Sequence, residues 1–181
     1  EANAQPGPCT ISVLAGTSPL ALSGAGAAAA AVGVLEVSVA VTILGEGLDQ
    51  TIVDGDQIDT VFDVATGTTA AIMGLTVRNG QGDGYPGGIS NSGTLTLQDC
   101  AIEGNTALNA NGGGVSNAGT LIVNRCRVGE NVADFNGGGL FNRGTLTLRD
   151  SSVTDNDTFQ FDGGGLANDN GASIVRNTTV S

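Results

Sequence analysis

The sequence predicts an all-β protein that folds as a right-handed, single-stranded parallel β-helix, a solenoid of six to seven coils with about 25 residues in each. Three observations predict this fold. A Gly-Gly-apolar-x-Asn block recurs every 25 or 26 residues, an alternating apolar segment follows each block, and no helical periodicity separates the segments. A βαβ unit needs a crossover helix and a leucine-rich repeat needs its Leu frame, so the sequence excludes both.

The recurring block predicts lines of asparagine side chains along the solenoid. Equivalent residues of stacked coils lie above one another, so their amide groups can hydrogen-bond along the axis. We expect one ladder from the block itself and a second from the polar turn that closes each coil. The glycine pairs of the block are expected to supply tight turns with positive φ. The first ladder comprises Asn91, Asn117, Asn142 and Asn168, and the second comprises Asn105, Asn131 and Asn156.

Two short strands are expected after each block. The first alternates with its Leu, Val and Ile side chains turned inward, and the second buries Ile102 or its equivalents Val128 and Val153. Together with the block these segments predict three strands per coil, each bonded to its counterpart about 4.8 Å away in the next coil. The first strands cover residues 93–97, 119–123, 144–148 and, less regularly, 171–175.

The same period continues upstream of the clear repeats. Ile52 lies 25 residues before Val77, and Val64 lies 25 residues before Ile89, so these pairs are expected to face each other in adjacent coils. The solenoid is therefore expected to begin before the clear repeats.

Two regions are expected along the chain. Residues 1–36 would form a first coil with a cap-like character, and residues 37–181 would form the β-helix coils, with the clearest repeats over 87–181. The Ala- and Gly-rich segment 23–34 is expected to be either a loop or a short helix that caps the solenoid.

The charge balance excludes several classes of partner. The chain carries 18 acidic residues against 6 basic residues, all Arg, and its net charge is −12. Nucleic acids and anionic membranes are bound through clustered Lys and Arg, so neither is an expected partner. No apolar stretch is long enough to span a bilayer. An acidic surface with these properties suits a secreted, extracellular or cell-surface protein.

Equivalent positions of adjacent coils also bring charges and thiols together. Asp99, Arg125 and Asp150 are expected to form a ladder of alternating charge. Cys100 and Cys126 are expected to stack as buried, reduced thiols, because parallel side chains keep the two sulfur atoms from turning toward each other.

Two groups of carboxylates are candidates for binding Ca²⁺, which takes six to eight oxygen ligands. One group comprises Asp54, Asp56, Asp59 and Asp63, and the other comprises Asp155, Asp157 and Asp162. Neither group has the spacing of an EF-hand or of a calcium-binding nonapeptide repeat. Solvated loop acids are the alternative, and no other cofactor is expected.

The repeats resemble those of polymorphic outer-membrane proteins and related bacterial surface proteins with pectin-lyase-like β-helices. The matching segments are 102–105, 128–131 and 153–156, each of which leads to the next Gly-Gly block, and residues 51–55 look like the TIIDG turn of such chains. This chain has Ile or Val where the family commonly has Phe. The resemblance implies a β-helix at a cell surface and no defined activity, because fold does not fix function.

The expected function is therefore an extracellular structural or adhesive module rather than an enzyme. Pectate-lyase-like enzymes share the architecture and, by resemblance, use a basic residue as proton acceptor, but this chain has no His and no Lys, and Arg is a poor base at neutral pH. A carbohydrate-binding or carbohydrate-cleaving β-helix is the alternative; it would need acids and Arg clustered on one face opposite a long loop. An ice or mineral binder would need Thr94, Thr120 and Thr145 to form a flat, exposed array.

Residues 178–181 fall in the register of 151–154, so the last coil is expected to have an open edge. Further β-helix coils of a longer protein would cover this edge, or a second copy would stack on it and build a filament. Besides such coils, surface glycans are the expected partners.

Overall fold

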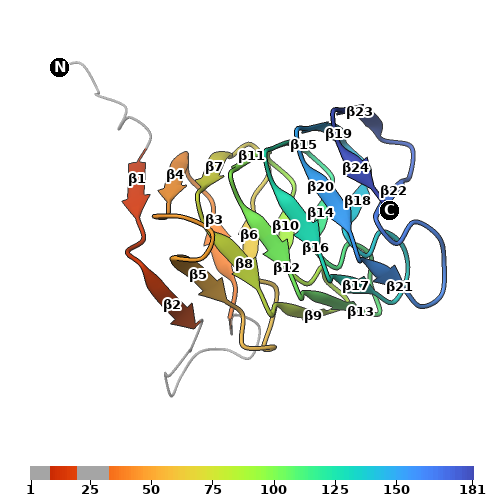
Figure 1. Ribbon diagram of the computed structural model, residues 1–181, viewed down its shortest axis with the longest axis horizontal. Coiled ribbons are helices and arrows are strands. Elements are labelled where there is room, and N and C mark those ends of the chain that lie inside the picture. The colour runs from red at the N-terminus through yellow and green to blue at the C-terminus, as the bar shows by residue number, and fades with distance from the viewer. Residues whose placement is uncertain (1–8, 20–32) are drawn as a thin grey trace.

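The computed structural model describes residues 9–19 and 33–181, which form a β-solenoid of about six turns with about 26 residues per turn (Figure 1). These residues make 24 strands and no helix. The prediction of an all-β parallel solenoid is confirmed. Most of the segment expected to be a loop or capping helix, residues 23–32, lies outside the described residues.

The described residues contain no apolar helix long enough to cross a membrane.

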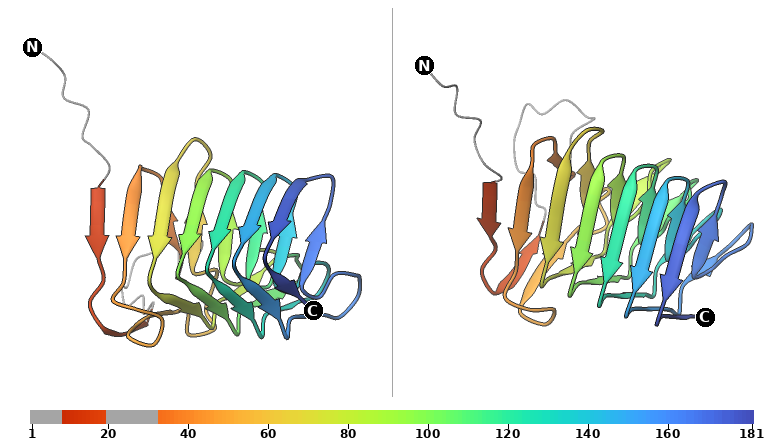
Figure 2. Two further views of the ribbon diagram at one scale, coloured as in Figure 1. Left: turned by 45° about the horizontal axis from the view of Figure 1, so that its top comes forward. Right: turned by 90° about the horizontal axis from the view of Figure 1, so that it is seen from above.

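Parallel strands of successive coils lie side by side and form three long sheets, A, B and C (Figure 2). Sheet A comprises β1 (Cys9–Ser12), β4 (Val41–Leu44), β7 (Thr69–Met73), β11 (Thr94–Gln98), β15 (Thr120–Asn124), β19 (Thr145–Arg149) and β23 (Ala172–Arg176). Sheet B comprises β2 (Gly16–Pro19), β5 (Thr51–Asp54), β8 (Thr76–Arg78), β12 (Ala101–Glu103), β16 (Arg127–Gly129), β20 (Ser152–Thr154) and β24 (Thr179–Val180). Sheet C comprises β3 (Leu35–Val37), β6 (Phe62–Val64), β10 (Ile89–Asn91), β14 (Val115–Asn117), β18 (Leu140–Asn142) and β22 (Leu166–Asn168).

A fourth sheet, D, departs from the expected three strands per coil. It lies between sheets B and C along the chain, in the segments that the sequence predicted to be polar turns. Those turns are short and extended enough to pair with one another, so four of the coils have four strands. Sheet D comprises β9 (Gln81–Asp83), β13 (Thr106–Leu108), β17 (Val132–Ala133) and β21 (Asp157–Thr158).

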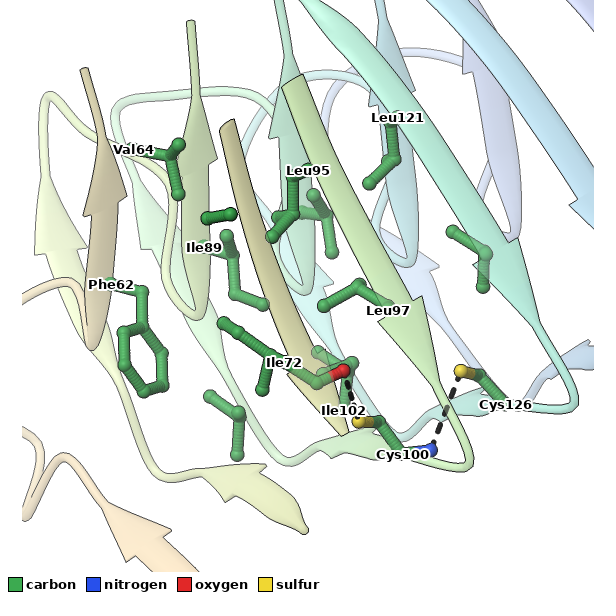
Figure 3. Packing of buried hydrophobic residues seen from close by; sticks show 14 of the residues in the cluster. Phe62, Val64, Ile72, Ile89, Leu95, Leu97, Cys100, Ile102, Leu121 and Cys126 are labelled. Carbon is green, nitrogen blue, oxygen red and sulfur yellow. Dashed lines mark hydrogen bonds between the residues drawn. The ribbon is translucent and has the colours of Figure 1, made fainter. Parts of the chain in front are cut away.

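The core is a continuous apolar column enclosed by sheets A, B and C. Leu95 and Leu97 of β11 point inward with Ile89 of β10 and Ile102 of β12, and all four side chains are fully buried (Figure 3). Burial of each such side chain contributes about 1.5–3 kcal/mol. The alternation predicted for the repeats therefore places the apolar face correctly.

The predicted register fails by one residue in sheet B near the amino terminus. Val77 pairs with Val53, not with Ile52. The side chains of a strand alternate between the two faces, so this shift buries Val53 and leaves Ile52 only partly buried. The connection from β5 to β6 contains no strand of sheet D, whereas the corresponding connection in later coils contains one. The number of residues between equivalent positions of successive coils is therefore not constant.

A second register error occurs in sheet C, where Val64 pairs with Asn91 rather than with Ile89. The first asparagine ladder therefore has an apolar neighbour, Val64, at its amino-terminal end.

The glycine pairs do not have the positive φ that we expected. Positive φ belongs instead to the glycine before three of the four pairs: 77° at Gly112, 66° at Gly137 and 80° at Gly163. The pairs allow coils to approach closely. A Cβ atom built on Gly88 would lie 2.5 Å from the carbonyl oxygen of Gly114, and one on Gly114 would lie 2.6 Å from that of Gly139.

Candidate functional site

The first asparagine ladder joins four coils along the carboxyl ends of the sheet C strands. The Nδ2 group of Asn91 donates to Oδ1 of Asn117 at 2.7 Å, Asn117 donates to Asn142 at 2.7 Å, and Asn142 donates to Asn168 at 2.6 Å. The first three side chains are buried and Asn168 is exposed. The predicted ladder is therefore present, with every amide oriented the same way.

The second ladder lies in the turn between sheets B and D. Asn105 donates from Nδ2 to Oδ1 of Asn131 at 2.9 Å, and Asn131 donates to Asn156 at 2.9 Å. The Oδ1 atom of Asn131 also accepts the backbone N–H of Asn105 at 3.0 Å. This turn interrupts the strand pairing, so the side chain supplies the acceptor that a buried N–H group requires.

Sequence reasoning missed a third asparagine contact. Both the backbone N–H and the Nδ2 group of Asn136 donate to Oδ1 of Asn111, each at 3.0 Å. The sequence does contain a pattern that could have predicted this contact, because an Asn precedes a Gly triplet in both coils.

Ion pairs connect coils in the same way. All four pairs among the described residues join a residue to one 24 to 26 positions along the chain. Arg125 binds Asp99 through two hydrogen bonds of 2.8 and 2.7 Å. Asp99 and, more weakly, the third member Asp150 raise the pKa of Arg125, while the side chain of Asp150 accepts a hydrogen bond from Asn177. Asp99, Arg125 and Asp150 lie in turns with φ near 50° rather than on strands.

The two stacked thiols belong to a hydrogen-bonded ladder of four side chains. The N–H of Cys100 donates to Sγ of Cys126 at 3.4 Å (Figure 3), that of Cys126 to Oγ of Ser151 at 3.1 Å, and that of Ser151 to Oγ1 of Thr178 at 3.3 Å. Each thiol or hydroxyl also donates to the carbonyl two residues before it. Thiol and hydroxyl groups occupy equivalent places, so the thiols here act as hydrogen-bonding groups.

The burial of these thiols predicts selective chemical modification. All three cysteines are free; Cys9 is exposed, and Cys100 and Cys126 are buried. The hydrogen bond with Cys100 and burial raise the pKa of the Cys126 thiol, which lowers its reactivity. We expect a thiol reagent to modify one cysteine in the native protein and three after unfolding, counted by mass spectrometry. Rapid modification of Cys126 in the folded state would contradict the ladder.

The two groups of calcium candidates lie in different coils. Asp54 accepts 2.8 Å and 3.0 Å bonds from Arg78 and from the amide of Asn79. Asp155 and Asp157 lie in a coil near the other end of the solenoid. Among the described residues, no three acidic, Cys or His side chains are placed to hold a metal ion.

The contacts of Asp54 predict an acid-dependent stability. Burial raises its pKa, but the bonds from Asn79 and Arg78 outweigh burial and lower the pKa below its ordinary value of 3.8. A carboxylate whose folded pKa is lowered stabilises the protein above its unfolded pKa, and that contribution is lost as the pH falls further. We expect Asp54→Asn to be less stable than wild type at pH ~7 and the difference to shrink below about pH 4, measured by thermal unfolding. A difference that does not depend on pH would contradict this assignment.

An acidic groove of about 850 Å³ lies on the outer side of sheet C in the amino-terminal half. Glu36 of β3 and Asp63 of β6 stand side by side on its floor. Asp59, Asp83 and the exposed Tyr85 also line the groove. Asp59 and Asp63 belong to the first group of calcium candidates. Glu36, Asp83 and Tyr85 were not expected at a site, because they come from separate segments with no common motif.

The chemistry of the groove is that of hydrogen-bond acceptors beside one aromatic ring. Asp59 accepts the N–H of Thr60 at 2.7 Å, and Asp83 accepts the amide of Asn109 at 2.9 Å. No Arg is among the described residues that line the groove. A carbohydrate-cleaving site was expected to combine acids with Arg, and the described lining of this groove contains the acids alone.

The threonine face is regular but interrupted. Thr94 pairs with Thr120, and Thr120 pairs with Thr145, in the outward column of sheet A. In the neighbouring column Ile122, 37% exposed, stands between two threonines.

Comparison with known proteins adds no relative. The chain matches no family model, no curated protein and no solved structure. The functional argument therefore depends on the ladders, the groove and the exposed surface.

Proposed function

We propose that the chain is an extracellular or cell-surface structural module with an adhesive role. The observation that carries this proposal is the use of polar side chains: the asparagine ladders and the ion pairs connect one coil to the next. In a solenoid each coil contacts only its neighbours, so contacts between adjacent coils are the ones that make the rod rigid along its axis. We propose that the outer faces of the sheets are then free to bind a surface.

The resemblance to surface proteins with pectin-lyase-like β-helices supports the same location. The segments that carry it, 102–105, 128–131 and 153–156, each contain a core residue and a ladder asparagine. The acidic surface and the absence of Lys are consistent with exposure outside the cell.

Further β-solenoid coils are the proposed partner at the carboxy-terminal edge. There β22, β23 and β24 each pair on one side only. Ile174, Val175 and Val180 are 48%, 43% and 42% exposed. Coils of the same kind, from a longer chain or a second copy, would pair with these strands and bury Val175 and Val180.

A second candidate function is glycan binding in the acidic groove, which the exposed ring of Tyr85 beside four carboxylates favours. The ring offers an apolar face, and the carboxylates accept hydrogen bonds from hydroxyl groups. With no His or Lys in the chain, we propose binding without cleavage.

Adhesion under flow tests the proposal. Beads coated with the protein are passed over intact cells and over immobilised neutral, amino-sugar and uronate polysaccharides. We expect retention on at least one surface and no change in polysaccharide chain length, measured by size-exclusion chromatography. Beads that wash off every surface would contradict the adhesive role, and shortened polysaccharide would show an enzyme.

A further inference from the structure

Exposed aromatic rings collect along one edge of the solenoid. The chain has six aromatic residues, and four of them lie in the loops that follow strands of sheet D. We call these four residues, Tyr85, Phe135, Phe159 and Phe161, the aromatic edge. Tyr85, Phe159 and Phe161 are 67%, 70% and 59% exposed.

Successive loops of this edge are held against one another. The N–H of Phe135 donates to the carbonyl of Ala110 at 3.1 Å, and that of Phe159 to the carbonyl of Ala133 at 3.1 Å. The rings of Phe135 and Phe161 meet edge to face with centroids 5.7 Å apart. The rings of all three phenylalanines therefore lie in adjacent coils, and Tyr85 lies two coils before Phe135 along the same edge.

Carboxylates accompany the rings, and basic residues do not. Asp83, Asp134, Asp157 and Asp162 lie in or beside the same loops, and the segments 81–86, 109–112, 132–137 and 157–163 contain no Arg. None of these four aspartates takes part in an ion pair among the described residues. The edge is therefore apolar and negatively charged at once.

A ring beside a carboxylate is a binding site for an organic cation, since the ring face attracts the cation and the carboxylate neutralises it. The protein contains one such arrangement already. The guanidinium group of Arg143 lies 5.2 Å from the centroid of the Phe141 ring, and its Nε atom pairs with Asp169 at 2.9 Å.

We propose that the aromatic edge binds an extended, arginine-containing segment of another protein. This inference rests on the proposed adhesive function and names the partner for one face. Charge complementarity favours a basic partner over a second copy, because each copy carries a charge of −12 and four of its six Arg residues are already paired. Planar guanidinium groups stack on rings better than the ammonium groups of amino sugars, which favours a peptide over a cationic glycan.

Fluorescence anisotropy tests the proposal with a labelled peptide of alternating arginine and glycine, and with a matched peptide in which neutral citrulline replaces arginine. We expect the arginine peptide to bind and the citrulline peptide to bind at least tenfold more weakly. The Phe159→Leu/Phe161→Leu variant should lose about tenfold in affinity. The Phe159→Tyr/Phe161→Tyr variant, which keeps both rings, should bind as wild type does.

Charge variants separate the site from the general acidity of the chain. Asp157→Asn/Asp162→Asn should weaken binding. Glu46→Gln/Asp49→Asn, which removes two exposed charges from the connection between β4 and β5, should weaken it far less. Equal binding of the two peptides, equal losses in the two charge variants, or a leucine variant that binds as wild type does would overturn the proposal. A glucosamine hexamer that binds the edge more tightly than the peptide would also overturn it. Beads still retained under flow would then show that the adhesive role stands without this partner.

Discussion

Asn117→Leu is expected to destabilise the solenoid by about 3 kcal/mol or more. Asn117 is 1% exposed and stands in the middle of the first ladder, where it accepts from Asn91 and donates to Asn142. Leucine has a similar volume but leaves buried polar groups on both neighbours without their partner, and each unpaired buried group costs about 1–3 kcal/mol. Urea unfolding followed by circular dichroism measures the loss.

Asn168→Leu is the matched control for this substitution. It removes the exposed last member of the same ladder, so one buried neighbour, Asn142, loses its acceptor, whereas Asn117→Leu deprives a neighbour on each side. We expect about half the loss or less, ~1 kcal/mol. Equal losses at Asn117 and Asn168 would show that the ladder does not depend on burial.

Gly119→Ala is expected to be at least as disruptive. Gly119 begins the turn into β15, and a Cβ atom there would overlap the carbonyl oxygen of Gly93 in the preceding coil. Gly93 and Gly119 both belong to backbone that is hydrogen-bonded between coils; for example, the N–H of Gly119 donates to the carbonyl of Asn91. Neither segment can therefore move aside. Overpacking costs about 1–3 kcal/mol in ordinary cores and more where the backbone must shift. We expect a large fall in the thermal midpoint or loss of folding.

Gly129→Ala is the control for the glycine substitution. A Cβ atom on Gly129 would lie 3.2 Å from the carbonyl oxygen of Thr154, a contact that a shift of a few tenths of an ångström relieves. We expect a change within about 1 kcal/mol. A Gly129→Ala variant as unstable as Gly119→Ala would mean that glycine is needed for a reason other than close approach of coils.

The sequence predicted the fold where the repeat is regular. The position of Asn91, Asn117, Asn142 and Asn168 in one line follows from a fixed spacing, because parallel strands bring equivalent residues together. The inward face of the β11, β15 and β19 strands follows from alternation alone. Neither inference needed knowledge of a turn.

Prediction failed where a turn or loop decides the geometry. The pairing of Val53 with Val77 depends on the length of one connection. Asp150 lies near Arg125 as expected, but its side chain hydrogen-bonds to Asn177, because the direction of the side chain determines the partner in these left-handed turns. The aromatic edge could not be predicted from the repeat, because Ala110 interrupts the row of rings and the rings belong to loops of different length.

Hydrogen exchange of asparagine side chains, measured by NMR, tests most directly the central claim that buried amides join the coils. The amides of Asn91, Asn117, Asn105 and Asn131 are buried and bonded between coils, so we expect their NH₂ groups to exchange far more slowly than the exposed Asn170. Slow exchange at these four positions and fast exchange at Asn170 is the predicted result. Exchange of all five at the rate of a surface amide would contradict the account.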